Sequence, residues 1–232
     1  KDSKVVLNKF FAFLVKTGHR ESNPVDKLPR VKVPKGTLNK PLATQALVKL
    51  LNSLDKTTWM GMRNFTIIAM LWALGLRVIE LRAITRQDIN LDYDPGNRTG
   101  TLLVHGKGGK ERTLFIVDAL FDTLFHYLRL KKTPQSPKSF IFPCTHGPII
   151  SRTRVRQMII ETADKAGITG RFTPHVFRHT FATDMYNRDV PVEAVKDMMG
   201  HESIRETSVY VHITDELQAM ALNKLSLKER VK

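Results

Sequence analysis

The sequence predicts a mainly α-helical chain with one small β-hairpin sheet, an α+β fold. Apolar residues recur at helical spacing through most of the chain after Leu42. One stretch, 101–117, differs: the β-rich runs TLLVH and ERTLFIV flank the turn GKGGK. A third feature, the proline-rich stretch 20–41, separates a short first segment from the rest.

The first segment has one predicted helix. Residues 5–15 (VVLNKFFAFLV) have helical apolar spacing, and Gly18 is a typical helix stop. Because prolines favour extended backbone, we expect residues 20–41 to form an extended basic linker. The chain opens at Lys1, so we expect residues 1–19 to be the end of an upstream, truncated domain.

Residues 42–232 are predicted to form one domain, largely from short helices. Thr173-Pro174 is a favourable helix start, with an N-cap oxygen followed by proline at the first helical position. The last helix, about 215–228, is amphipathic. The other predicted helices span 42–54, 59–74, 77–84, 118–131, 151–166, 174–187, 191–199 and 203–210.

Charge is the unusual bulk property of the chain. Lys and Arg number 37 against 22 Asp and Glu, a net charge of +15. This favours a polyanionic partner such as DNA, because each neutralised phosphate releases counterions; on charge alone, a membrane surface or a solvated basic surface stays open. The lone Cys144 excludes an internal disulfide and a cysteine-based zinc site. The longest apolar run, ten residues at 67–76, is far shorter than the ~20 needed to span a bilayer.

Two predicted site residues come from the first half of the domain. Arg77 offers a planar, permanently charged fork for phosphate oxygens, and Glu80 lies three residues on, on the same helix side. Lys107 lies in a glycine-rich turn that lets DNA approach closely, where a lysine can give a proton to a leaving oxygen. Taken alone, Arg77 is more typical of a surface ion pair with Glu80, and Lys107 of an exposed turn lysine. Lys110 and Arg112 are rivals of Lys107 for a role in the turn.

His175 and Arg178 form a sharper pair. They lie three apart at a helix start, next to free N–H groups, and combine a proton shuttle with a fixed charge. His179 lies four residues from His175, a metal-ligand spacing. However, Val-Phe-Arg between them supplies a cation and no glutamate, so we predict no metal site and interpret His179 as structural.

His201 and Tyr210 complete an ordered set. A tyrosine hydroxyl, with a pKa of about 10, is a poor nucleophile unless activated. Neighbouring cations favour the phenolate and stabilise a pentacoordinate phosphorus. His201 alone is also typical of a helix C-terminus, and Tyr210 of packing beside two valines. Taken together, the order and types of these residues indicate phosphodiester cleavage without a metal.

Five segments carry a family resemblance: GLRVIEL, HGKGGKER, TPHVFRHTFAT, MMGH and TSVYVH. With them the chain resembles the tyrosine recombinases, the integrase superfamily, from about Leu42 to Thr214. The resemblance implies that family's catalytic domain fold, and makes residues 1–19 the last helix of a core-binding domain. One departure is Met199, where the family more often has leucine before Gly-His.

The resemblance also implies a mechanism. Tyr210 attacks a DNA phosphodiester and forms a 3′-phosphotyrosine, while Lys107 protonates the leaving 5′-oxygen. Arg77, Arg178 and His201 brace the phosphate, and His175 is the candidate base. Glu80 supports the first arginine, and no metal, ATP or other cofactor is needed. Further expected DNA contacts are Lys110, Arg112, Arg152 and Arg154.

The resemblance implies double-stranded DNA as partner, bound by a homotetramer on two DNA sites in the bacterial cytoplasm, associated with the nucleoid. The last helix would pack on a neighbouring protomer or on its own domain. Accessory DNA-bending or directionality proteins stay open. So do the target sequence and the biological role, whether phage, transposon, integron or chromosome-dimer recombination.

Three alternative functions have distinct signatures. A type IB topoisomerase shares the arginine, lysine, histidine and tyrosine set, but usually has lysine where His175 stands. A non-catalytic basic DNA-binding protein has no use for the ordered set. A metal-dependent nuclease would be inhibited by a chelator.

Overall fold

The computed structural model describes residues 2–27, 41–91, 98–130, 132–145, 147–170 and 172–200. The chain separates into two compact units, residues 1–38 and 39–232, and each is described by itself. The predicted helices 203–210 and 215–228 lie outside the described residues, as do His201 and Tyr210. The predicted domain boundaries stay a prediction.

The first unit contains helix α1 (Asp2–Lys16) and the short 3-10 helix η1 (Pro24–Lys27). The chain leaves α1 through Gly18, whose φ of +75° is typical of a glycine helix stop. η1 packs against α1 and buries Val25. This part of the predicted linker is therefore not extended, because the fixed φ of proline also suits a first helical turn.

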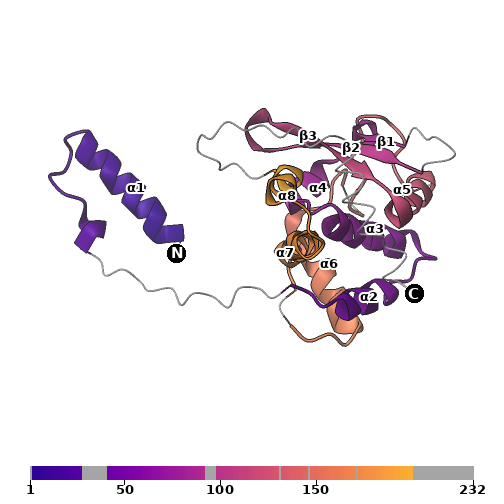
Figure 1. Ribbon diagram of the computed structural model, residues 1–232. Coiled ribbons are helices and arrows are strands. Elements are labelled where there is room, and N and C mark those ends of the chain that lie inside the picture. Colours follow the sequence, from indigo (N-terminus) through magenta and orange to yellow (C-terminus); the bar gives the residue numbers. More distant parts are fainter. Residues whose placement is uncertain are drawn as a thin grey trace. The chain divides into compact units, whose positions relative to one another are not determined.

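Helix α3 (Trp59–Ala73) is the centre of the second unit (Figure 1). It is buried on nearly all sides and apolar around its circumference, as a central helix must be. The Thr58 hydroxyl caps it by accepting from the Gly61 N–H at 3.1 Å. Around it pack α2 (Thr44–Asn52), α4 (Val78–Ala83), α5 (Asp118–Arg129) and α7 (Pro174–Tyr186).

The predicted hairpin is confirmed, and it belongs to a three-stranded antiparallel sheet of order β1-β2-β3. β2 (Gly100–His105) pairs with β3 (Glu111–Ile116), which places Val104 opposite Arg112. The connection is a short 3-10 turn, η3 (Lys107–Gly109). The sequence did not predict β1 (Ile89–Asn90), because two residues give no alternating pattern.

The remaining helices are the short 3-10 helix η2 (Arg86–Asp88) and the α-helices α6 (Arg152–Lys165) and α8 (Val192–Met199). Both α6 and α8 contact α7. Pro174 opens α7 as predicted. Thr173 occupies the N-cap position, but its side chain makes no capping hydrogen bond; its carbonyl accepts from the Val176 N–H instead. The mainly helical fold with a small sheet is confirmed. Within the described part of the chain, no helix is both long enough and apolar enough to cross a bilayer.

Candidate active site

Arg77 occupies the N-cap position of α4, where its backbone is extended. Its N–H donates to Glu80 Oε2 at 2.9 Å, and its Nη1 donates to Glu80 Oε1 at 2.8 Å. Glu80 thus reaches back over the first turn, as in a capping box, and lies buried. The Arg77 side chain is 36% exposed, so one edge of a well-oriented guanidinium faces solvent.

Arg77 and Arg178 meet at the C-terminus of α8. Arg178 donates from Nη2 to the Met199 carbonyl at 2.7 Å and from Nη1 to the Gly75 carbonyl at 2.6 Å. Arg77 donates to the same Met199 carbonyl at 3.3 Å and to the Gly200 carbonyl at 2.9 Å. Carbonyls at a helix end lack intrahelical partners and carry the negative end of the dipole, so they can hold two cations side by side.

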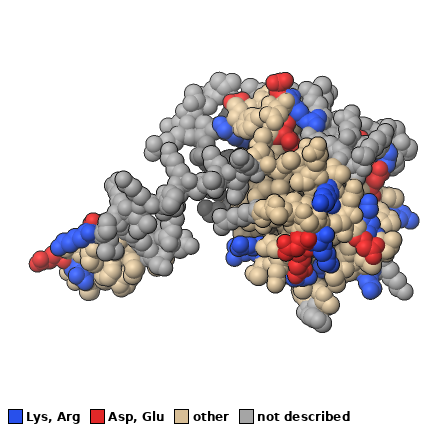
Figure 2. Space-filling view, turned by 90° about the horizontal axis from the view of Figure 1, so that it is seen from below, with Lys and Arg blue, Asp and Glu red and all other residues tan. Residues whose placement is uncertain are grey.

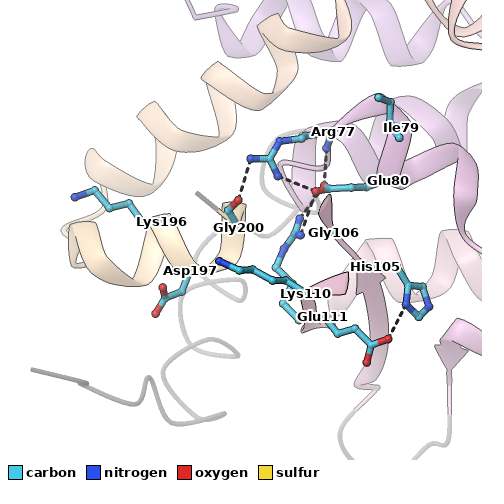
Figure 3. A pocket seen from close by; sticks show the side chains of 11 residues that line it. Arg77, Ile79, Glu80, His105, Gly106, Lys110, Glu111, Lys196, Asp197 and Gly200 are labelled. Atoms are coloured by element: carbon cyan, nitrogen blue, oxygen red, sulfur yellow. Dashed lines mark hydrogen bonds and ion pairs between the residues drawn. The ribbon is translucent and has the colours of Figure 1, made fainter. Parts of the chain in front are cut away.

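Arg112, on β3, is the third guanidinium of this cluster. Its Nε donates to the Met198 carbonyl at 2.8 Å, and its two terminal nitrogens donate to the two oxygens of Glu80 at 3.2 and 2.8 Å. We call Arg77, Arg112 and Arg178, gathered around Glu80 and the end of α8, the arginine cluster; Figure 3 shows Arg77 beside Glu80 and Gly200. The Arg112 side chain is only 14% exposed and points inward. Its predicted DNA contact is untested and stays a prediction.

The charges of the cluster perturb one another. Burial alone would raise the pKa of Glu80, but hydrogen bonds from Arg112 and Arg77 outweigh it and lower that pKa below its ordinary value. Burial, followed by repulsion from Arg77, lowers the pKa of Arg178 to about 10. Arg178 is therefore still a cation at neutral pH, and Glu80 is an anion.

A pocket of about 680 Å³ opens beside the cluster (Figure 3). Lys110, which is exposed, extends over it from the hairpin, while Arg77 and Glu80 approach from α4. Its lining comprises Arg77, Ile79, Glu80, His105, Gly106, Lys110, Glu111, Arg112, Lys196, Asp197 and Gly200. Most of these residues come from α4, the hairpin and the end of α8, so the pocket joins three distant segments of the sequence.

His105 lies at the turn end of the hairpin, at this pocket. Its Nε2 lies 3.0 Å from Asp88 Oδ1, and its Nδ1 lies 2.9 Å from Glu111 Oε1. The hydrogen bond with Asp88 is the largest cause, and it raises the pKa of His105. Burial opposes it, while the charge of Asp88 and the hydrogen bond and charge of Glu111 add to the rise. Sequence reasoning missed His105, because its carboxylate partners lie on two other elements.

A second pocket, of about 420 Å³, contains the His-x-x-Arg pair. His175 and His179 are both exposed and line it together with Arg178. The interpretation of His179 as a hydrogen-bonded structural histidine is not tested by the described residues and stays a prediction. Lys196 lines both pockets from the last turn of α8. The sequence analysis missed it; the signal was a lysine four residues before Gly200, where the helix dipole favours a cation.

Lys107 lies in the hairpin turn, at the start of η3; the position of its side chain is not described. The turn is closed by a 2.7 Å hydrogen bond from the Gly106 N–H to the Lys110 carbonyl. Gly108 and Gly109 have φ of +75° and +76°, and a methyl group on either would meet open space. The backbone of the turn that contains Lys107 is therefore not closely packed at these two glycines.

The remaining predicted DNA contacts lie apart from both pockets. Arg152 and Arg154 begin α6, and neither lines a pocket described above. Arg154 instead pairs with Glu161 on the same helix at 2.9 Å. Figure 2 shows one face of the molecule on which basic and acidic side chains are interspersed. In the described ranges, no three His, Cys, Asp or Glu side chains are grouped so that they could hold a metal ion.

Comparison with known proteins decides the family. Residues 40–216 match the phage integrase family. The chain belongs to this family. It is 32% identical over 217 residues to the tyrosine recombinase XerC of Oceanobacillus iheyensis, covering 90% of this chain and 68% of that protein. The predicted enzyme class, a tyrosine site-specific recombinase, is thereby confirmed.

Solved structures agree with the fold. The integrase of mycobacterium phage Brujita is 25% identical, with a TM-score of 0.63 over 96% of this chain and 70% of that chain. A lambda integrase tetramer bound to a Holliday junction is 16% identical, with a TM-score of 0.63 over 89% of this chain and 59% of that chain.

Proposed function

We propose that this chain cleaves and rejoins double-stranded DNA through a 3′-phosphotyrosyl intermediate on Tyr210, without metal or ATP. The observation that carries the proposal is the meeting of Arg77 and Arg178 at the Met199 carbonyl. Two guanidiniums from separate helices are held together beside open pockets, immediately before the segment that begins with His201. Two adjacent, permanently charged forks suit the two non-bridging oxygens of a phosphodiester.

The proposed chemistry balances without a cofactor. The Tyr210 oxygen attacks phosphorus, and the bond from phosphorus to the 5′-oxygen breaks. His175 accepts the tyrosine proton, and Lys107 donates one to the leaving 5′-oxygen. Attack by a 5′-hydroxyl of a partner strand reverses the step, so the energy of the phosphodiester is conserved in the tyrosine link.

Arg77, Arg178 and His201 would brace the phosphate during this transfer. Arg178 has a lowered pKa of about 10 but remains protonated at neutral pH. Its hydrogen bonds to the Gly75 and Met199 carbonyls fix its direction before DNA arrives. Such preorganised cations stabilise a transition state without reorganisation at the moment of reaction. Glu80 supports the arrangement by orienting Arg77.

The proposed partner is double-stranded DNA, bound by a homotetramer on two sites. The tetrameric lambda integrase on a Holliday junction supports this assembly, as a protein of the same fold. Lys110 and Lys196, which line the pockets, are proposed phosphate contacts beside Arg152 and Arg154. The bacterial XerC relative supports a bacterial cytoplasmic setting. Accessory proteins remain a proposal for the full recombination reaction.

A covalent trap tests the proposal. The full-length protein is incubated with fragmented genomic DNA of its source in the presence of a chelator, and SDS-resistant protein–DNA adducts are isolated and sequenced. We expect adducts with the wild type and with Tyr186→Phe, and none with Tyr210→Phe. Tyr186 is the matched control, because it is an exposed tyrosine that lines the second pocket. Adducts that persist in Tyr210→Phe would contradict the proposal. So would wild-type adducts that form only when the chelator is left out and divalent metal is present.

A further inference from the structure

Arg112 was expected at the DNA surface, yet its guanidinium lies inside the protein. It makes a two-pronged ion pair with Glu80 and a third hydrogen bond to the Met198 carbonyl. A planar fork that engages both oxygens of a carboxylate fixes the direction of both partners, which a single ammonium cannot do. The position therefore uses the shape of arginine as well as its charge.

Glu80 transmits this restraint to Arg77. The buried carboxylate also accepts from the Arg77 N–H and from Arg77 Nη1. Without Arg112, one guanidinium would no longer hold Glu80 from the hairpin side, and the carboxylate could rotate away from Arg77. Arg77 is the most exposed member of the cluster. Removing the largely buried Arg112 guanidinium would therefore change the orientation of Arg77 at the proposed phosphate site.

The end of α8 is packed against the same guanidinium. Gly200 has φ of +63°, and a methyl group placed on it would come within 2.9 Å of Arg112 Nη1. Arg112 thus occupies the space that any other side chain at position 200 would need. Together with its bond to the Met198 carbonyl, this contact fixes the end of α8.

Arg112 joins three segments that line the candidate site. It lies on β3, the strand that follows the turn of Lys107, and it contacts α4 through Glu80 and α8 through Met198. We propose that Arg112 is a positioning residue that aligns Arg77 and the end of α8 with the hairpin, and that it does not itself touch DNA. This inference rests on the proposed function, which supplies the reaction that the alignment serves.

The test compares Arg112→Gln and Arg112→Lys with Arg82→Gln in the full chain. Arg82 is the matched control, because it also donates to a backbone carbonyl, that of Ile150 at 2.7 Å, but lines neither pocket. On duplex DNA recovered from the covalent trap, the equilibrium dissociation constant is measured separately from the single-turnover adduct rate at saturating DNA.

We expect Arg112→Gln to lower the saturated adduct rate by about 100-fold, since misplacement by about an ångström costs that much. The dissociation constant should change by less than about 3-fold, because no phosphate contact is lost. Arg112→Lys should recover only part of the rate. Arg82→Gln should keep the wild-type adduct rate. A weaker dissociation constant with an unchanged saturated rate would overturn the proposal and make Arg112 a DNA contact.

Hydrogen–deuterium exchange of the same variants, without DNA, tests the alignment independently of activity. Arg112→Gln should speed amide exchange at the end of α8, whereas Arg82→Gln should not. Unchanged exchange there, or equal losses of rate and melting temperature in both variants, would overturn the positioning role. If the wild type forms no adduct, the proposed function fails, while the exchange result still decides whether Arg112 holds α8.

Discussion

The arginine cluster and the hairpin turn are both proposed to serve the same phosphate transfer, but they are built in opposite ways. Arg178 is buried and bonded to two carbonyls, and Arg112 is held by Glu80 and α8. Around the turn, Gly108 and Gly109 have only open space beside them. The difference suits two tasks: fixed cations stabilise charge, whereas a proton donor on an open turn can approach and leave.

The largest expected effects come from removing a guanidinium of the cluster. Arg77→Ala and Arg178→Ala should each lower the single-turnover adduct rate by about 10²–10³-fold, as for loss of one preorganised donor. Arg178→Ala should also lower the free energy of unfolding by about 1–3 kcal/mol, and by more than Arg77→Ala, because it leaves two buried carbonyls without that donor whereas the Arg77 side chain is 36% exposed. Urea unfolding measures this; equal destabilisation by both variants would contradict the inward, anchored role of Arg178.

Glu80→Gln should destabilise the arginine cluster by an amount that depends on pH. The pKa of Glu80 is lowered from its ordinary 4.5, so its ionised form stabilises the fold above that pH. That stabilisation is lost as the pH falls through the lower, folded-state pKa. Glu80→Gln should therefore cost about 1.5–3 kcal/mol at neutral pH and progressively less in acid, since hydrogen bonds to a charged group are worth that much.

Denaturant unfolding of both proteins from neutral to acidic pH checks this expectation. A difference in unfolding free energy that stays constant down to strongly acidic pH would mean that the charge of Glu80 does not stabilise the cluster.

Two glycines with positive φ give a matched pair. Gly75 and Gly108 have φ of +59° and +75°, so alanine is strained by about 1–2 kcal/mol at either. A methyl group on Gly75 would also come within 2.5 Å of Phe181, whereas one on Gly108 meets nothing within 4 Å. Gly75→Ala should therefore lose about 1–3 kcal/mol more than Gly108→Ala, the usual cost of overpacking. Equal losses in thermal unfolding would show that the two regions are packed alike.

The smallest expected effect concerns His105, at the turn end of the hairpin. The pKa of His105 is raised from 6.5, so its charged pairs with Asp88 and Glu111 stabilise the fold below that pH. This contribution is lost as the pH rises through the raised, folded-state pKa. Because the ring is about half exposed, His105→Gln should lower the melting temperature by at most about 2–4 °C at low pH and by less at high pH. A larger effect at high pH would contradict the assignment.

Local patterns in the sequence predicted most of the fold. Helices such as α3 and α7 follow from apolar spacing and from Pro174, and the hairpin follows from β-rich runs around GKGGK. The two-residue strand β1 was missed, because its only evidence is the pairing of Ile89 with Leu102. Part of the linker was wrongly expected to be extended, because its packing against α1 is a tertiary contact.

The site was predicted as a set of residue types, without its internal geometry. The order from Arg77 to Arg178 indicated a phosphate site, and the Arg77–Glu80 pair follows from helical spacing. Nothing local distinguishes Arg112 from its exposed neighbour Lys110. Its inward direction depends on Glu80 and on the end of α8, both distant in sequence. Lys196 was missed for the same reason, since only folding brings α8 between the two pockets.

The most direct test of the central claim, fixed cations beside a lysine proton donor, replaces the leaving 5′-oxygen of the cleaved phosphodiester by sulfur. A thiolate is a far better leaving group than an alkoxide, so its departure needs no proton. We predict that Lys107→Ala, slow on the normal substrate, regains nearly the wild-type adduct rate on the sulfur substrate, while Arg77→Ala stays slow on both. Rescue of Arg77→Ala, or no rescue of Lys107→Ala, would contradict the division of roles between the cluster and the turn.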